Sequence, residues 1–553
     1  MGKAMSTLAI RNGLVVDGTG GAPGRRDVFV RDGKIASGVD APERTIDAAG
    51  RIVSPGFIDI HTHFDPQLCW DGLATPSLEH GVTTVVIGNC SLSLAPVKPE
   101  GTAKLISMFQ VIEDIKKPTF DAAVPWCWET FPEYLDFIRG KLGVNVGALI
   151  GHSAVRAYVM GAASQERAAN AAEIDEMCRI VEEAMAAGAL GISSSYLDMD
   201  ENMRPVPSRY AEIDEKLALA KAMSASGRGV WQVVPYIVDP EQLLDNIREL
   251  GDISLAADIP CSLQPVLGSG GRALDDQVRA LTEQHERGAR VYGQTMPRTF
   301  DMNMRLSETS MLLFGYPTWK SIMDLPASER AAEFGDPGKR QALVEEMVPR
   351  ENSIFGIGHM RVGDVKSKQN EQYQGRTVNE IAEAEGKRIG EVVLDLSLRD
   401  DLDTEFKLEG VVNADQDAVA RLIDSPLCHF GASDAGAHIT QFCGSGDTTY
   451  MLSHFVREAG TMPLERAVHR MTGEVARDWG IRDRGTLEEG QAADIVIFDA
   501  DRVAITKDEF VDDFPGEARR YVRRAEGFDR VLVNGEQVYG TEGYTSARPG
   551  RIV

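Results

Sequence analysis

Two histidines stand one residue apart in the stretch GFIDIHTHFD, residues 56–65. The Pro-Gly break before Phe57 and the largely apolar residues after it predict a buried strand over residues 57–60. Alternate side chains of a strand share a face, so His61 and His63 should point the same way. Two converging imidazoles suit a single divalent cation, but two polar histidines that merely end a strand would have the same spacing. The rest of the chain has to decide between these two interpretations.

Strand-like and helical segments alternate from about residue 56 to about residue 480. The segments that read as strands are GFIDIHTH, VTTVVIGNC, VNVGALIGHSAVR, ALGISSSYLD, GVWQVVPY, PCSLQPVLG, RVYGQT and PLCHFGASD. Amphipathic runs such as AAEIDEMCRIVEEAMAAG and DDQVRALTEQHERG lie between them. Eight strands alternating with helices predict an α/β fold, a (β/α)8 TIM barrel whose active site lies at the carboxyl ends of the strands.

Both ends of the chain are rich in short strands and tight turns. RDGK near the start and VNGE near the end are hairpin signals. We therefore expect residues 1–55 and 483–553 to pair into one small β-sandwich domain, and residues 56–482 to form the barrel. The stretch from about 297 to 355 is too long for a simple βα loop, and we expect a lid or substrate-binding insertion over the barrel mouth.

Composition narrows the class of protein. A length of 553 residues fits one large barrel with an accessory domain, and 43% hydrophobic with 26% charged residues is typical of a soluble enzyme. The net charge of −26 repels phosphate backbones and anionic lipids, which argues against nucleic-acid and membrane partners. The seven cysteines include no CxxC pair, and the N-terminus lacks the apolar core of a secretory signal. We expect a reduced, cytoplasmic protein that binds a small-molecule substrate and forms a homo-oligomer, since barrels of this size often pair.

The motifs of four predicted strands resemble the amidohydrolase superfamily. They are GFIDIHTH, HGVTTVVIGNCSLSLAP, GH followed by Arg, and SDAG, in that order along the chain. Within the superfamily the sequence is similar to the D-aminoacylase (N-acyl-D-amino-acid deacylase) group, and the tail RGTLEEGQAADIVIFD resembles the return of such chains to their β-sandwich. The resemblance covers nearly the whole chain. It implies that His61, His63, Cys90 and Asp434 bind or serve a metal centre.

The other candidates also have interpretations that need no metal. Cys90 ends an apolar strand, where a buried, inert cysteine is common, although a thiolate beside a metal is a strong zinc ligand. Asp434 alone could be a helix N-cap, but its place on the last strand favours the site. His152, at the end of strand three, is predicted to face the same mouth as a partner of a ligand or a substrate contact. His438, one helical turn after Asp434, is placed similarly.

The sequence departs from the family on strands five and six. The resemblance implies a metal-binding histidine on each, but Gln232 and Gln264 stand at about those places. None of the ten histidines lies between His152 and His285, and strand four has no lysine that could be carbamylated to bridge two metals. Neutral amides are poor zinc ligands, so we expect one zinc per chain, with another divalent metal as the alternative. The two glutamines and Gln294 are predicted to line the substrate pocket with His438.

These features predict a metal-dependent amidohydrolase that cleaves a C–N amide bond of a small molecule, first of all an N-acyl amino acid. Zinc would lower the pKa of bound water toward ~7, Asp434 would carry the proton to the leaving nitrogen, and His152 would help to stabilise the oxyanion. Two alternatives stay open: a hydrolase or lyase of another carbonyl substrate, such as a cyclic amide, lactone or ester, and a metal-poor, non-catalytic scaffold. The four candidate ligands argue against the scaffold, and the two missing histidines argue for it.

Overall fold

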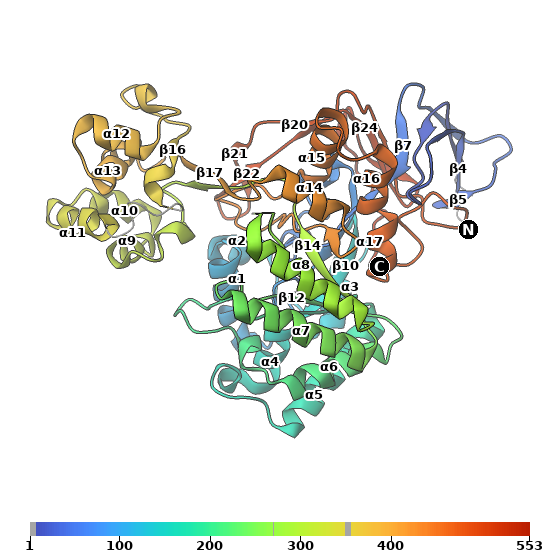
Figure 1. The fold of residues 1–553 in the computed structure, drawn as a ribbon, viewed down its shortest axis with the longest axis horizontal. Helices are drawn as coiled ribbons and strands as arrows, with labels where there is room; N and C mark the ends of the chain where they lie inside the picture. Colours follow the sequence, from blue (N-terminus) through green and yellow to red (C-terminus); the bar gives the residue numbers. More distant parts are fainter. Residues whose placement is uncertain (1–6, 269, 349–355) are drawn as a thin grey trace.

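The computed structural model describes residues 7–268, 270–348 and 356–553, and a sheet of eight parallel strands lies at its centre (Figure 1). The strand order is β18-β14-β13-β12-β11-β10-β9-β8, so neighbours in the sheet are neighbours among the barrel strands along the chain. Each strand lies in a segment predicted from the sequence. Their bounds are β8 (Phe57–Asp59), β9 (Val82–Ile87), β10 (Asn145–Gly151), β11 (Gly191–Ser195), β12 (Val230–Val234), β13 (Cys261–Leu263), β14 (Val291–Thr295) and β18 (Cys428–Phe430).

Backbone contacts join the first and last strands of this sheet just beyond their carboxyl ends. Thr62 and Ala435 form a parallel bridge. The Asp434 amide donates to the His61 carbonyl at 3.1 Å, and the His63 amide donates to the Ala435 carbonyl at 2.8 Å. The curled parallel sheet with these contacts fits the predicted TIM barrel. The same contacts set the His-Thr-His segment directly against Asp434.

Helices pack around the sheet, and their sequences explain their bounds. Helix α5 begins with a capping box, in which the Glu173 amide donates to the Asn170 side chain and the Asn170 amide donates to the Glu173 carboxylate. It ends at Gly188, whose φ of 118° is unfavourable for other residues. The other main helices are α1 (Thr102–Ile112), α3 (Phe131–Ile138), α4 (His152–Met160), α6 (Ile213–Ser224), α7 (Pro240–Ala257), α8 (Gly271–Glu286), α14 (Gln416–Asp424), α16 (Leu464–Met471) and α17 (Gly473–Asp478), with α5 over Ala171–Ala187. Among the described residues, no helix combines the length and the apolar character that crossing a membrane requires.

Strands from both ends of the chain pair with one another. The N-terminal β7 (Ile52–Pro55) lies antiparallel to the C-terminal β19 (Ile495–Phe498). They belong to a seven-stranded sheet that also contains β2 (Leu14–Val15), β3 (Gly24–Arg25), β24 (Phe528–Val533), β25 (Glu536–Gly540) and β26 (Gly543–Tyr544). A four-stranded sheet holds β1 (Thr7–Arg11), β4 (Val28–Arg31), β5 (Lys34–Ala36) and β6 (Arg44–Asp47).

The seven-stranded sheet packs on both of its faces. In β19, Ile495 and Ile497 belong to a core shared with the four-stranded sheet, whereas Val496 and Phe498 belong to the main core that includes the barrel. This division follows the two-residue period of a strand. The barrel and the terminal sheets therefore share a core, and the structure does not confirm a separate β-sandwich domain.

An excursion between β14 and α14 forms a lobe at the side of the molecule (Figure 1). It contains β15 (Phe300–Met304), α9 (Pro317–Met323), α10 (Ala327–Phe334), α11 (Pro337–Met347), β16 (Arg361–Val362), α12 (Val378–Glu385), α13 (Ile389–Arg399) and β17 (Phe406–Val412). The excursion is longer than the predicted 297–355 because β15 pairs with β17, far along the chain. Residues 349–355 of the predicted range lie outside the described residues. The lobe has a hydrophobic core of its own, and its role as a lid stays a prediction.

Candidate metal centre

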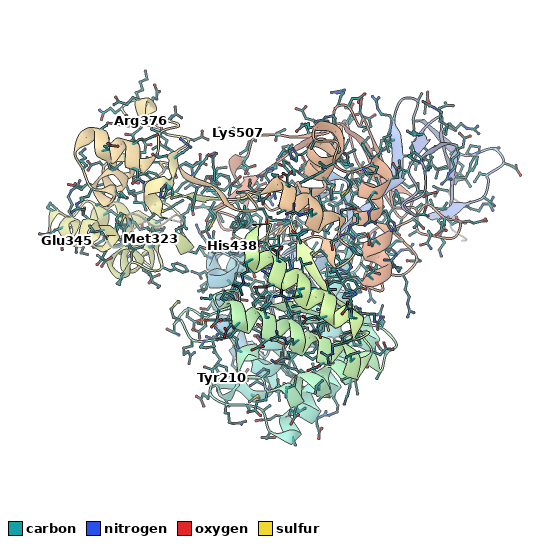
Figure 2. The ribbon with its side chains drawn as sticks, viewed as in Figure 1. Tyr210, Met323, Glu345, Arg376, His438 and Lys507 are labelled. Carbon is teal, nitrogen blue, oxygen red and sulfur yellow. The ribbon has the colours of Figure 1, made fainter. Side chains whose placement is uncertain are left out.

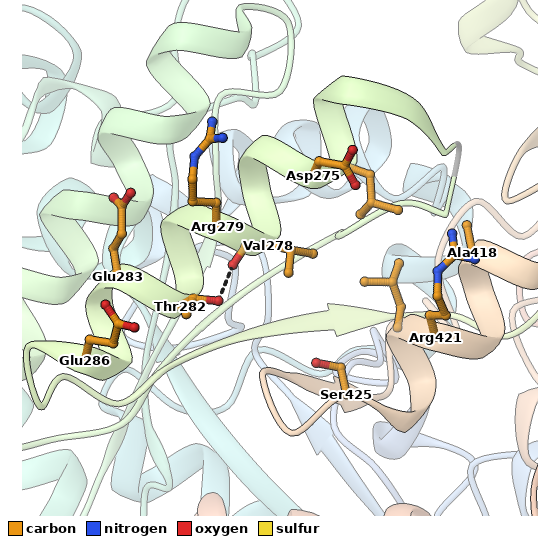
Figure 3. A pocket seen from close by; sticks show the side chains of 11 residues that line it. Asp275, Val278, Arg279, Thr282, Glu283, Glu286, Ala418, Arg421 and Ser425 are labelled. Atoms are coloured by element: carbon orange, nitrogen blue, oxygen red, sulfur yellow. Dashed lines mark hydrogen bonds between the residues drawn. The ribbon is translucent and has the colours of Figure 1, made fainter.

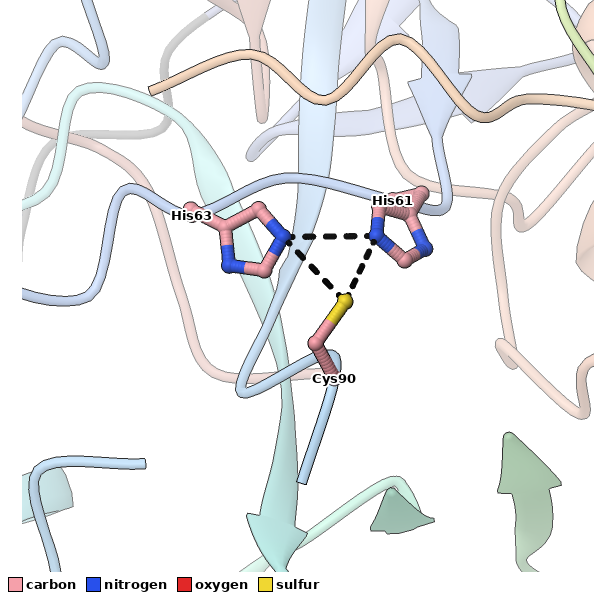
Figure 4. A group of neighbouring side chains, drawn as sticks. All are labelled: His61, His63 and Cys90. Atoms are coloured by element: carbon pink, nitrogen blue, oxygen red, sulfur yellow. Dashed lines mark hydrogen bonds between the residues drawn. The ribbon is translucent and has the colours of Figure 1, made fainter. Parts of the chain in front are cut away.

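Four donor atoms meet where the barrel closes, and Figure 4 shows three of the side chains. The Nε2 atoms of His61 and His63 lie 3.3 Å apart, and the Cys90 Sγ lies 3.4 Å from the first and 3.6 Å from the second. The Asp434 Oδ1 lies 3.1 Å from the His63 Nε2 and 3.6 Å from the His61 Nε2. The structure thus brings together all four residues that the sequence predicted as ligands.

The distances among the two imidazole Nε2 atoms and the Cys90 Sγ, and those from the imidazoles to the Asp434 Oδ1, match edges of a zinc coordination tetrahedron. With zinc–ligand bonds of about 2.0–2.3 Å, neighbouring nitrogen or oxygen donors lie about 3.3 Å apart, and nitrogen lies about 3.6 Å from sulfur. The donor set of two imidazoles, a thiolate and a carboxylate also suits zinc. His61, His63 and Cys90 therefore form a group that fits a single divalent ion, and Asp434 lies beside both imidazoles.

The GNC segment after β9 is shaped to return Cys90 to the histidines. Gly88 has a φ of 77°, and a Cβ there would lie 2.0 Å from the Leu149 carbonyl oxygen, so only glycine fits. The Asn89 side chain donates to the Thr62 carbonyl at 3.2 Å, which ties the segment to the His-Thr-His stretch. Cys90 itself takes the left-handed conformation with a φ of 55°. Such backbone in a non-glycine residue is strained and is characteristic of functional sites.

The backbone of Asp434, like that of Cys90, is in the left-handed conformation. Its φ is 60°, and no helix begins at it, so the N-cap interpretation is wrong. The neighbouring Ser433 hydroxyl donates to the Asp59 carboxylate on β8 at 2.6 Å. Asp59, whose function the sequence did not reveal, thereby couples the last strand of the barrel to the first.

The surroundings of the cluster hold several buried carboxyl groups. Burial raises the pKa of Asp59 to about 7, of Asp65 to about 6, of Glu113 to about 8 and of Asp198 to about 6. Burial lowers the pKa of His63, but the neighbouring Glu113 and Asp434 carboxylates outweigh it and raise the value to about 9.

Among the described residues, the ion-pair partners of Glu113 and Asp434 are histidines, with no lysine or arginine. Buried carboxylates without such a partner are costly in free energy. A bound cation would supply the missing positive charge.

Glu113, which the sequence analysis missed, lies directly behind one ligand. Its Oε1 is 3.2 Å from the His63 Nδ1, and its side chain is buried. The two atoms lie at ion-pair distance without a hydrogen bond of good geometry, and a carboxylate on this side favours a proton on Nδ1, which leaves the opposite nitrogen free for a metal. The only sequence signal was the acidic pair Glu113 and Asp114. It directly follows α1 within the mostly apolar run FQVIEDI, residues 109–115.

His152 directly follows β10, as predicted, but its ring makes contacts other than the predicted ones. Its Nδ1 lies 3.1 Å from the Ser194 hydroxyl and its Nε2 lies 2.8 Å from the Glu215 carboxylate, which also pairs with Arg156. Both ring nitrogens are thus engaged in a buried network at the start of α4. This geometry argues against its predicted contact with an oxyanion.

The three glutamines support the donor atoms and are largely enclosed. The Gln264 amide donates to the Cys90 Sγ at 3.4 Å, and the Gln232 side-chain oxygen accepts from the Cys90 backbone amide at 3.3 Å. Gln294 donates to Ser262 at 2.9 Å, and its proximity to His61 opposes the lowering of the pKa of that histidine by burial. Their predicted contacts with substrate stay untested, but their contacts with Cys90 and His61 suggest a positioning role.

His438 lies at the edge of the cluster, between the side lobe and the barrel (Figure 2). Its Nε2 is 3.7 Å from the Asp434 Oδ2, its Nδ1 has no hydrogen-bond partner among the described residues, and its side chain is 14% exposed. Its backbone is in the left-handed region, with a φ of 47°. Its position suits a contact with a substrate that approaches Asp434.

A groove of about 640 Å³ between α8 and α14 lies elsewhere, on the outer ring of helices (Figure 3). Its apolar floor includes Val278 and Leu422, and its rim carries charged residues such as Arg279 and Arg421. None of its lining residues is a donor of the metal cluster. The chemistry therefore belongs to the barrel mouth and not to this groove.

The family described as the amidohydrolase family matches residues 44–345 and 366–539 of this chain. The chain therefore belongs to the amidohydrolase family. D-Aminoacylase from Alcaligenes xylosoxydans xylosoxydans is 28% identical and covers 99% of this chain and 97% of its own length. N-Acyl-D-glutamate deacylase from the same organism is 30% identical, with 99% and 96% covered.

The fold agrees with these relatives. A solved D-aminoacylase structure, reported for a binuclear metal centre with one-metal activation and second-metal attenuation, matches with a TM-score of 0.66 at 27% identity over 98% of both chains. This chain is accordingly a hydrolase of carbon–nitrogen bonds other than peptide bonds, and the non-catalytic scaffold interpretation is not supported.

We expect Cys90→Ala to abolish tight metal binding and activity, because it removes the only sulfur donor of the cluster. Metal per chain, measured by elemental mass spectrometry on protein purified without chelators, checks this. Cys127→Ala, at an exposed cysteine, is the control and should keep its metal. Undiminished metal in Cys90→Ala would show that sulfur is not a ligand.

We expect Glu113→Gln to weaken metal affinity by roughly 10–100-fold, because the neutral amide no longer fixes the His63 tautomer. Competition with a coloured chelator measures the dissociation constant, and thermal melting checks the fold. Glu182→Gln, at an exposed residue of α5, should leave the affinity unchanged. Equal affinities in the two variants would contradict the role assigned to Glu113.

We expect the double change Gln232→His and Gln264→His to raise the metal content from one ion per chain to two. Both side chains already contact Cys90, so two imidazoles there would converge on the same sulfur. The single variants serve as controls and should bind less of the second ion. A folded double variant that still holds one ion would refute this account of the glutamines.

Proposed function

We propose that this protein is a deacylase that uses one zinc ion per chain to hydrolyse the amide bond of N-acyl amino acids. Its preferred substrates are N-acyl-D-amino acids. The observation that carries the proposal is the group of His61, His63 and Cys90 at zinc-compatible spacing, with Asp434 beside both imidazoles, at the mouth of an amidohydrolase barrel. The substrate class follows the relatives, whose names are D-aminoacylase, N-acyl-D-aspartate deacylase and N-acyl-D-glutamate deacylase.

His61, His63, Cys90 and Asp434 would hold the ion. When bound, zinc supplies a Lewis acid that polarises the carbonyl and makes water acidic near neutral pH. A single ion is consistent with the amides that face Cys90 in place of imidazoles. The one-metal activation reported for a D-aminoacylase supports the same count.

Asp434 is the residue best placed to move a proton. Burial raises its pKa, but the hydrogen bond and charge of His63 outweigh burial and hold the pKa below its usual range, so the carboxylate is ionised at neutral pH. Its side chain is 19% exposed, whereas those of His61 and His63 are buried. It can therefore accept a proton from the attacking water and deliver it to the leaving nitrogen.

His438 completes the proton-handling edge of the site. Its free Nδ1 and its place beside the Asp434 Oδ2 suit a donor to the substrate carbonyl or carboxylate, the contact that His152 does not offer. Phe442 packs against its ring at 5.4 Å between centroids and restricts its orientation.

The test is amine release from N-acetyl amino acids of both configurations by the metal-loaded enzyme. We expect hydrolysis of D substrates, and we expect Asp434→Asn to lower kcat/KM by about 10²–10⁴-fold because the amide cannot accept the proton. Metal content is measured in the same samples, so that loss of chemistry is separated from loss of the ion.

Lactones, esters and cyclic amides form the second arm of the screen. Turnover of one of these classes by metal-loaded enzyme, without hydrolysis of any N-acyl amino acid, would replace the proposed substrate class. Full activity of the Asp434→Asn variant would remove Asp434 from the mechanism.

A further inference from the structure

A second cavity, of about 480 Å³, lies at the end of the barrel opposite the metal centre. Its lining includes Gly229, Pro260 and Arg290, which directly precede β12, β13 and β14. The candidate metal ligands instead follow the carboxyl ends of their strands. The two sites are thus separated by the length of the barrel, and this cavity takes no part in the proposed hydrolysis.

Arginine side chains dominate this cavity. Four arginines and two aspartates line it. Arg290 pairs with Asp258 at 2.9 Å, and Arg477 pairs with Asp478 at 2.7 Å. The remaining positive charges are those of Arg228 and Arg482. Neither makes an ion pair or side-chain hydrogen bond in the described part of the chain.

The two unpaired guanidinium groups also repel each other. Burial lowers the pKa of Arg228, and the charge of Arg482 lowers it further, while no carboxylate compensates. This is unexpected in a chain with 84 acidic and 58 basic residues, where a carboxylate partner is easy to supply. Like charges that face one cavity without counter-charge raise the free energy of the folded state.

Arginines are also common near the carboxyl ends of helices, where they need no ligand. Helices α6, α7 and α17 end near this face, and cations favour the negative ends of helices. That explanation accounts for Arg290, which donates to the carbonyl of Asp258 just after α7. It does not account for Arg228 and Arg482, which bond to no carbonyl in the described structure.

The backbone beside these arginines leaves room for a ligand. Gly227 and Gly480 line the same cavity, and a Cβ added at either would meet no atom within 4 Å. A cavity of this volume accommodates a small organic molecule. Guanidinium groups bind phosphate and carboxylate groups through paired N–H donors.

We propose that Arg228 and Arg482 form a binding site for a small, multiply charged oxyanion at the amino-terminal end of the barrel. The ligand class is a phosphate-bearing or polycarboxylate molecule, and the bound anion supplies the counter-charge that the chain itself omits. The site is independent of the metal centre and of the proposed deacylase activity.

Thermal melting and calorimetric titration with sodium pyrophosphate and with citrate, at constant ionic strength, test this site. We expect saturable stabilisation of the wild-type chain. We expect Arg228→Ala/Arg482→Ala to weaken the binding at least tenfold, while hydrolysis of the metal-loaded enzyme is unchanged. Arg482→Ala alone serves as a second variant, since Arg482 is exposed and its loss should not affect folding.

The charge-matched control is Arg179→Ala/Arg272→Ala, at exposed helix residues, which should bind the anions like the wild type. Binding of these anions to a metal ion would be equal in all variants and therefore cancels in the comparison. Preference for pyrophosphate or citrate identifies the ligand class. Equal loss in both double variants, no loss in either, or no saturable binding at millimolar concentrations would overturn the proposal.

Discussion

The site depends on closure of the barrel between its first and last strands. His61 and Asp434 are far apart in the sequence, but the hydrogen bond from the Asp434 amide to the His61 carbonyl places them side by side. The bridge between Thr62 and Ala435 also joins the segments that follow the first and last strands. The hydrogen bond from Ser433 to Asp59 joins the last of these segments to the first strand. Backbone atoms make most of these contacts, so they depend on the fold and not on the metal ligands' side chains. Positioning by such contacts lowers the cost of assembling a metal site.

Electrostatics explain why such a cluster needs a cation. Buried carboxylates at Asp59, Asp65, Glu113 and Asp198 surround the donors, and burial raises the pKa of each. A site with only neutral groups would avoid this cost. The negative charge is tolerable when a divalent ion compensates it, and Glu113 then acts through His63 as the partner that orients the imidazole.

The glutamines stand where the resemblance implied metal-binding histidines, and they contact Cys90 instead. At Gln264 the amide donates a hydrogen bond to the Cys90 sulfur, where an imidazole would offer a lone pair. At Gln232 the side-chain oxygen fixes the backbone of Cys90, which is held in a left-handed conformation. Both residues stabilise the cysteine and neither is a good metal ligand. The same places on strands five and six therefore support the proposed single-ion centre without forming a second one.

The sequence by itself determined the strand segments of the barrel, because these depend on local patterns of apolar strands and turns. Its resemblance to the amidohydrolase superfamily supplied the four candidate ligands. Glu113, the true partners of His152, and the length of the excursion up to β17 could not be predicted, because each follows from contacts between residues distant in the chain. The tertiary structure alone decided which strand-end side chains face the centre and which, like His152, turn into a buried network. Periodicity assigns a residue to a face, but only the packing of neighbouring elements selects its partner.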